Sequence, residues 1–168
     1  MSNKIEYRAF DKANNINAIL KSVVKEKSFG NWLPISGNYS DDGGFEIYKS
    51  FTSTYSTPYL GPFIKAHTTV VNTNWAKTTS KIIIKRINGA SYYTHFFICI
   101  IIIALIFIKS LTNYINKSEF LEFEWHITPL FCGIYMLLVE LWAMSSFNTI
   151  SNRIIELVNT DGIEVKKL

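Results

Sequence analysis

Two ionisable residues lie in stretches of the sequence that are otherwise apolar. His95 precedes thirteen consecutive apolar residues, 96–108, and Glu140 interrupts a second apolar stretch, 125–145. An ionisable side chain inside a membrane helix is costly and is by default a candidate functional residue. We expect His95 and Glu140 at a similar depth of roughly 6–8 Å, where they can form a hydrogen bond or an ion pair. The alternative is that each side chain reaches the headgroup layer separately.

Other residue types that could carry chemistry do not form a recognisable site. The common motifs for phosphate, dinucleotide, zinc-hydrolase and serine-hydrolase sites are absent from the sequence. Cys99 and Cys132 fall in the apolar stretches, which makes them packing residues. Asp41 and Asp42 are too few carboxylates for a calcium loop, and the two glycines after them favour a hairpin turn. We therefore expect no catalytic residue, cofactor or metal site, and no enzyme activity.

Two stretches are long and apolar enough to cross a bilayer as helices. The first, 91–111, matches the roughly 20 residues that a hydrocarbon core needs, and it is too long for a strand. The second, 125–145, carries Trp125 and Trp142 near its ends, where an aromatic belt would place them. The connection between the stretches is short and polar, so we expect an antiparallel hairpin with both termini on one side of the membrane.

Basic residues near the ends of these stretches set the expected orientation. Four of them precede the first span: Lys77, Lys81, Lys85 and Arg86. The segment between the spans, 109–124, holds two lysines and three glutamates. Basic residues collect on the cytoplasmic side of a membrane protein. We therefore expect an integral protein of a bacterial inner membrane with both termini in the cytoplasm, and the four basic residues at the membrane surface.

Residues 1–90 form the expected soluble domain, which has twelve basic and six acidic residues. A basic domain beside a bilayer is attracted to anionic headgroups. We expect membrane lipid as one partner, and another protein or a second copy of the chain as a further partner. The basic residues are not interleaved with aromatic ones as in a nucleic-acid site, so nucleic acid is not expected.

Apolar periodicity predicts the elements of this domain. Residues 11–27 have an apolar stripe at helical spacing, with Asp11 as a cap and Gly30 as the end signal. Runs rich in β-branched and aromatic residues between glycines and prolines predict five strands: 35–40, 45–52, 60–65, 68–74 and 80–86.

The end of the chain is predicted to return to the domain. Residues 147–159 are amphipathic, and we expect the second span to continue as a helix whose apolar stripe packs on the domain. Residues 163–165 alternate and predict an edge strand. The expected fold class is α+β: a soluble domain of one helix and antiparallel strands (1–90), an inserted transmembrane hairpin (91–145), and an amphipathic C-terminal helix with a tail (146–168).

Short motifs give this order of elements a likeness to a known group. Phe45-Glu46-Ile47 forms an F-x-I strand, Ser56-Thr57-Pro58-Tyr59-Leu60-Gly61 follows as a Ser-x-Pro turn, and Thr69-Val70-Val71 lies where the next strand begins. The order resembles a loosely defined group of small bacterial membrane proteins with a strand-rich cytoplasmic domain and two spans. Gly61 comes one residue earlier than in that group. The resemblance implies the architecture and no activity.

Two functions fit this architecture. The first is a non-enzymatic membrane protein whose cytoplasmic domain binds a partner, a lipid surface or a ligand, alone or within a larger complex. The alternative is an oligomeric pore or membrane-disrupting effector gated by the domain. A pore needs a polar stripe along its lumen, and the first span offers only Ser91, Thr94 and His95, which favours the first function.

Overall fold

The computed structural model describes residues 3–25, 35–49, 62–73, 78–117 and 123–168. Its elements follow in the order β1 (Lys4–Ala9), α1 (Ala13–Lys25), β2 (Ile35–Tyr39), β3 (Phe45–Lys49), β4 (Ile64–Asn72), β5 (Ser80–Asn88), α3 (Ala90–Lys117), α4 (Phe123–Thr160) and β6 (Val165–Lys167). The predicted α+β class is confirmed. Gly30, the predicted end signal of the first helix, and Lys77, one of the predicted basic residues, lie outside the described residues.

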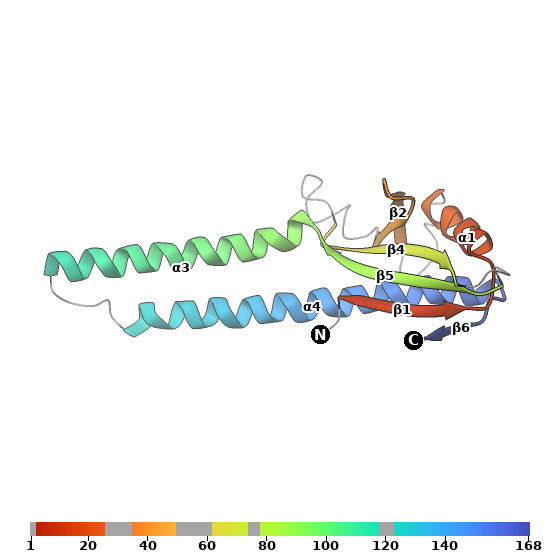
Figure 1. Ribbon diagram of the computed structural model, residues 1–168. Coiled ribbons are helices and arrows are strands. Elements are labelled where there is room, and N and C mark those ends of the chain that lie inside the picture. Colours follow the sequence, from red (N-terminus) through yellow and green to blue (C-terminus); the bar gives the residue numbers. More distant parts are fainter. Residues whose placement is uncertain (1–2, 26–34, 50–61, 74–77, 118–122) are drawn as a thin grey trace.

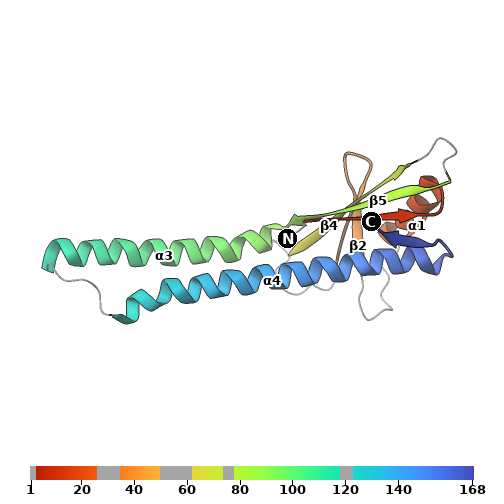
Figure 2. The same cartoon turned by 60° about the horizontal axis from the view of Figure 1, so that its bottom comes forward.

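The strands form one antiparallel sheet in the order β2-β3-β4-β5-β1-β6. Helix α1 and the C-terminal half of α4 cover one face of this sheet (Figure 1). Helix α3 and the N-terminal half of α4 project from the domain side by side, and both views show them as a long antiparallel pair (Figure 2). We call this pair the apolar hairpin.

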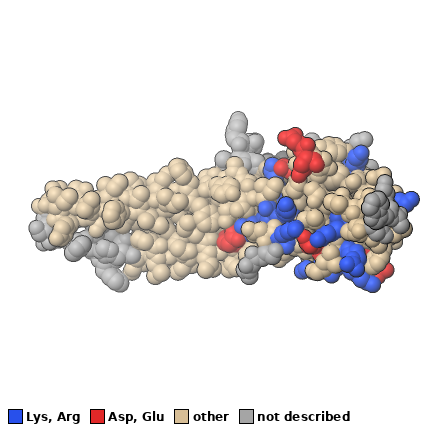
Figure 3. All heavy atoms as spheres, in the orientation of Figure 1, with Lys and Arg blue, Asp and Glu red and all other residues tan. Residues whose placement is uncertain are grey.

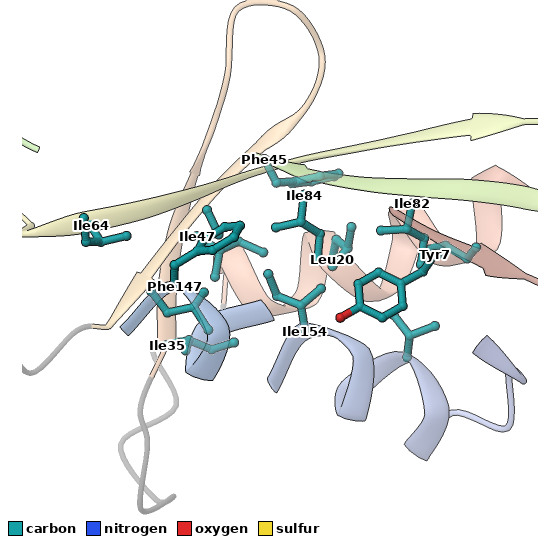
Figure 4. Close-up of a cluster of buried hydrophobic side chains, with 14 of the residues drawn as sticks. Tyr7, Leu20, Ile35, Phe45, Ile47, Ile64, Ile82, Ile84, Phe147 and Ile154 are labelled. Carbon is teal, nitrogen blue, oxygen red and sulfur yellow. The ribbon is translucent and has the colours of Figure 1, made fainter. Parts of the chain in front are cut away.

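The core lies between the sheet and the two helices that cover it (Figure 4). Strand side chains alternate between faces, so Ile82 and Ile84 of β5 point to the same side and are fully buried. The stripe predicted for residues 147–159 packs against them, with these members buried: Phe147, Ile150, Ile154 and Val158. Each such side chain contributes about 1.5–3 kcal/mol when it is buried. This half of α4 is therefore part of the core of the domain.

The predicted strands agree with the sheet except at two places. The expected strands 60–65 and 68–74 are parts of one strand, β4, because Ile64, Ala66 and Thr68 continue a single buried face through His67. Residues 50–52 of the expected strand 45–52, residues 60, 61 and 74, and the Ser-x-Pro turn at 56–61 lie outside the described residues. The expected edge strand at 163–165 forms two residues later, as β6.

Strand β1 was not predicted, although its sequence carries a strand pattern. Ile5, Tyr7 and Ala9 alternate with charged residues, and Tyr7 and Ala9 are buried on the core side. The strand pairs with β5 over its whole length and with β6 on its other side. Without β1, the sequence could not predict which charged residues lie beside Lys81 and Lys85 in the sheet.

The turn predicted at Asp41 and Asp42 is confirmed between β2 and β3. The backbone N–H of Gly44 donates to Oδ1 of Asp42 at 3.1 Å, and Oδ2 lies 2.9 Å from Nε2 of His67. The N–H of Gly44, with help from Ser40 and His67, holds the pKa of Asp42 below its usual value. The carboxylate of Asp42 therefore fixes the turn.

Gly89 joins β5 to α3 at the base of the apolar hairpin. Its N–H donates to the carbonyl oxygen of Phe63 at 2.9 Å. A Cβ atom at position 89 would lie 1.7 Å from the carbonyl oxygen of Pro62, which is far inside contact distance. Only glycine fits here, and its close approach to the segment before β4 sets the direction in which α3 leaves the sheet.

Gly89→Ala should destabilise the protein strongly, because the added methyl group has to displace backbone atoms at a cost of about 1–3 kcal/mol or more. The measurement is thermal unfolding of the purified chain in detergent, followed by circular dichroism. Gly133→Ala is the matched control, since nothing lies within 4 Å of a Cβ atom there and alanine is the better helix former by about 1 kcal/mol. Equal unfolding temperatures for Gly89→Ala and the parent chain would contradict this account of the junction.

Candidate functional site

Three polar side chains meet where the sheet joins the apolar hairpin. Arg86 at the end of β5 donates from Nη1 to Oε1 of Glu140 at 2.7 Å and from Nη2 to Oε2 at 3.0 Å. The hydroxyl of Tyr92, in the first turns of α3, donates to the same Oε2 at 2.7 Å. Arg86, Tyr92 and Glu140 come from three elements, and we call them the junction cluster. Both carboxylate oxygens of Glu140 are thus engaged by donors.

Burial makes this ion pair more than a surface contact. The side chain of Arg86 is only 5% exposed, whereas that of Glu140 is 37% exposed. The guanidinium also lies 5.7 Å from the centre of the Tyr92 ring. A buried guanidinium without a counter-ion would be costly, and two parallel hydrogen bonds to a carboxylate are the strongest compensation available to it. Glu140 therefore allows Arg86 to be buried at this position.

The structure gives His95 and Glu140 separate partners. Nδ1 of His95 forms a 2.7 Å hydrogen bond with the hydroxyl of Tyr135. Because the two helices are antiparallel, Tyr92 faces Glu140 near the base of the hairpin, and His95 faces Tyr135 about one turn further along. At 1.5 Å per residue, these levels lie about 3 Å and about 8 Å beyond the start of α3. The two residues predicted to share one depth therefore lie at different levels.

Aromatic rings surround the base of the hairpin. Phe63, just before β4, stacks on Trp142 of α4 with 4.7 Å between ring centres, and it lies 5.7 Å from Tyr92 and 5.9 Å from His95. Phe63 is buried, while Trp142 is 56% exposed. The sheet is thus attached to both helices of the hairpin by ring contacts as well as by the junction cluster.

Arg86 differs from the surface residue that the sequence predicted. It lies on the core side of β5, at even spacing from Ile82 and Ile84, and the strand alternation directs it toward α4. Arg86 is the counter-ion of Glu140, and its position at the membrane surface stays a prediction. The pair joins residues 54 positions apart, so only the alternation along β5, and no local motif, could have signalled it.

Lys81 and Lys85 lie on the opposite, outer face of β5. Nζ of Lys81 is 2.6 Å from Oε2 of Glu6, and Glu6 also pairs with Lys4. These hydrogen bonds from Lys4 and Lys81 hold the pKa of Glu6 below its usual value. Lys85 is exposed and lies directly opposite Lys4 in the β1–β5 ladder. Lys81 and Lys85 therefore lie on the surface of the domain, and their position at the membrane surface stays a prediction.

No family model, curated protein or solved structure matches this chain. Its function has to be inferred from its own residues. Both oxygens of Glu140 accept hydrogen bonds, from Arg86 and Tyr92, so the junction cluster joins three elements. The site is a mechanical connection between the sheet and the apolar hairpin.

Glu140→Leu should lower the free energy of unfolding by about 3–5 kcal/mol, because it leaves the Arg86 guanidinium buried and unpaired. The double variant Arg86→Met/Glu140→Leu removes both charges and should recover most of that loss. The measurement is thermal or denaturant unfolding in detergent. If the double variant is no more stable than Glu140→Leu, the ion pair is not what the junction depends on.

His95→Ala and Glu140→Ala should have additive effects on unfolding, within about 0.5 kcal/mol, because each residue bonds to a different partner. His95→Ala with Tyr135→Phe provides the matched cycle, in which the effects should not be additive. Strong coupling between His95 and Glu140 would contradict the arrangement described here.

Proposed function

We propose that this protein is an integral membrane protein in which the apolar hairpin spans the bilayer and the α+β domain is a non-enzymatic binding domain. The observation that carries the proposal is the exposure of the hairpin. The spans Ala90–Asn116 and Ile127–Thr160 have mean hydropathies of 2.4 and 1.7, and only 6% and 17% of their most apolar windows are buried. A helix from the core of a soluble protein would be mostly buried. The exposure of these two helices therefore supports a membrane anchor in addition to their length and composition.

Large apolar side chains account for this exposure. Among them, Ile100 is 56% exposed, Leu105 is 60% exposed and Phe107 is 69% exposed. Each Å² of apolar surface left in water costs about 25 cal/mol, and soluble monomers rarely expose a continuous apolar surface of this extent. Lipid removes that cost. At 1.5 Å per residue, the 28 residues of α3 extend about 42 Å, which is close to the full thickness of a bilayer.

The base of the hairpin suits the membrane–water boundary. Tyr92, Tyr93 and Trp142 lie at this level, and such rings favour the headgroup region. The paired charges of Arg86 and Glu140 lie at the same level, where water and headgroups are near. On the face shown in Figure 3, charged side chains gather over the domain, while most of the hairpin carries none.

The orientation follows from the same distribution of charge. Basic residues are concentrated in the domain, which under the positive-inside rule favours a cytoplasmic domain with both termini inside. A bacterial inner membrane is the setting that we propose. The partners that suit the domain are membrane lipid and an additional protein, or a second copy of the chain. The apolar exposed surface of the hairpin supports an anchor better than a pore, which needs a polar stripe.

Alkaline carbonate washing of cell membranes should leave the chain in the pellet, because a spanning hairpin is held by its apolar surface. In intact cells, Asn116→Cys at the far end of α3 should react with a membrane-impermeant maleimide. Asn38→Cys in β2 should react only after permeabilisation. The parent chain, whose Cys99 and Cys132 are buried, serves as the control.

Release of the chain by carbonate would reject the membrane anchor. Retention with the opposite labelling pattern would keep the anchor and reject the cytoplasmic orientation.

A further inference from the structure

A cavity lies between the two helices of the apolar hairpin. Its volume is about 320 Å³, and its wall is mainly apolar, with Ile102 and Phe131 among the residues that line it. The polar side chains of His95 and Tyr135 also line it, at the end nearer to the domain. Pockets for small ligands have volumes of roughly 300–1,000 Å³ and combine apolar walls with a few polar groups. The cavity therefore has the size and the lining of a small-ligand site.

The pair of His95 and Tyr135 has a hydrogen-bond donor to spare. A neutral imidazole and a phenol hydroxyl carry one polar hydrogen each, and the 2.7 Å hydrogen bond between the two residues uses only one of these hydrogens. Among the described residues, neither side chain makes a further hydrogen bond. A donor without an acceptor is costly in the apolar interior of a membrane. A ligand with an acceptor oxygen at this end of the cavity would remove that cost.

The two cysteines, which the sequence assigns to packing, bring a second feature to the same cavity. Cys99 and Cys132 are free and buried, and their thiols lie within hydrogen-bond distance of each other. Both residues line the cavity. Cys99 follows His95 by four residues, so the two lie on the same face of α3, one turn apart. Two adjacent thiols can be oxidised together to a disulfide when a two-electron oxidant reaches them.

The depth of the cavity limits its ligand to a molecule that dissolves in lipid. At 1.5 Å per residue, His95 lies about 8 Å and Ile102 about 18 Å beyond the start of α3. The headgroup layer accounts for about the first 5–7 Å, so His95 lies just inside the hydrocarbon core and Cys99 lies deeper. A matching ligand has an acceptor oxygen at its shallow end, an apolar body, and the ability to oxidise thiols. A quinone has all three properties.

We propose that this cavity binds the ring of a membrane quinone, and that Cys99 and Cys132 reduce it. This inference rests on the proposed membrane anchor, because only a hairpin in lipid meets such a molecule. One carbonyl oxygen of the quinone accepts the spare hydrogen of the His95–Tyr135 pair, and the ring lies beside the thiols. Two S–H bonds break and one S–S bond forms, while the quinone takes up the two electrons and two protons and leaves as the hydroquinone. The disulfide cross-links α3 to α4, so the hairpin records the redox state of the quinones around it.

Binding is tested in the variant Cys99→Ser/Cys132→Ser, which cannot react. The full chain in detergent is titrated with decylubiquinone, a short-tailed quinone, and followed by thermal shift, because a ligand of the folded state raises the unfolding temperature. In this background, His95→Leu should weaken binding about fivefold, the effect of one lost hydrogen bond. Ile102→Phe should weaken binding at least as much, because the larger side chain fills the cavity. Ile101→Phe is the matched control, since Ile101 does not line the cavity, and it should change nothing.

The reaction is tested with the reduced parent chain and decylubiquinone in the absence of oxygen. Each chain should yield one hydroquinone, which is measured by its ultraviolet absorbance. After unfolding, Cys99 and Cys132 should no longer react with an alkylating reagent, and the chain should remain a monomer on a non-reducing gel. The single variants Cys99→Ser and Cys132→Ser should each yield no hydroquinone.

Thiols that stay reduced, a disulfide between two chains, or equal weakening of binding by Ile101→Phe and Ile102→Phe would each overturn the quinone site. Flotation of the parent chain with phosphatidylcholine vesicles separates this proposal from the membrane anchor. A chain that floats but does not react rejects the quinone site alone. A chain that does not float rejects the anchor and, with it, a membrane quinone as the ligand.

Discussion

Helix α4 is continuous over 38 residues. One half of this helix lies outside the domain and the other half lies in its core. Its N-terminal half exposes apolar side chains such as Leu130 and Leu137, and its C-terminal half buries a stripe against the sheet. The change from one environment to the other occurs near Glu140, where the helix carries a charge. Arg86 compensates that charge from the sheet, and the relative positions of sheet and hairpin depend on this contact.

The junction is fixed by several independent contacts. The ion pair joins β5 to α4, the Tyr92 hydroxyl adds α3, and the ring of Phe63 packs between the two helices. Gly89 then brings the start of α3 against the backbone before β4. With so many contacts at one level, a movement of the hairpin would have to be accompanied by a movement of the sheet. The sheet and the apolar hairpin are therefore mechanically linked.

The elements that the sequence predicts correctly are those that have a local periodicity. The two apolar helices, the stripe on residues 147–159 and most strands follow from spacings within a few residues. The partner of Glu140 could not be found in this way, because Arg86 is distant in the chain and faces inward only through the register of β5. Counting residues from the ends of the spans predicts a similar depth for His95 and Glu140, where they can pair or reach the headgroups separately. The antiparallel alignment of the helices instead places Tyr135 opposite His95. Strand β1 was overlooked despite its alternation, and with it the opposition of Lys4 to Lys85.

The central claim is that the N-terminal half of α4 lies in lipid and that the boundary with water falls near Glu140. Spin labels at exposed positions along the helix in reconstituted vesicles test it directly, through their collisions with oxygen and with a water-soluble nickel complex. Labels at Leu130, Ile134 and Leu137 should be accessible to oxygen and shielded from nickel, and labels at Asn148 and Asn152 should show the reverse. Nickel access along the whole helix would contradict the account.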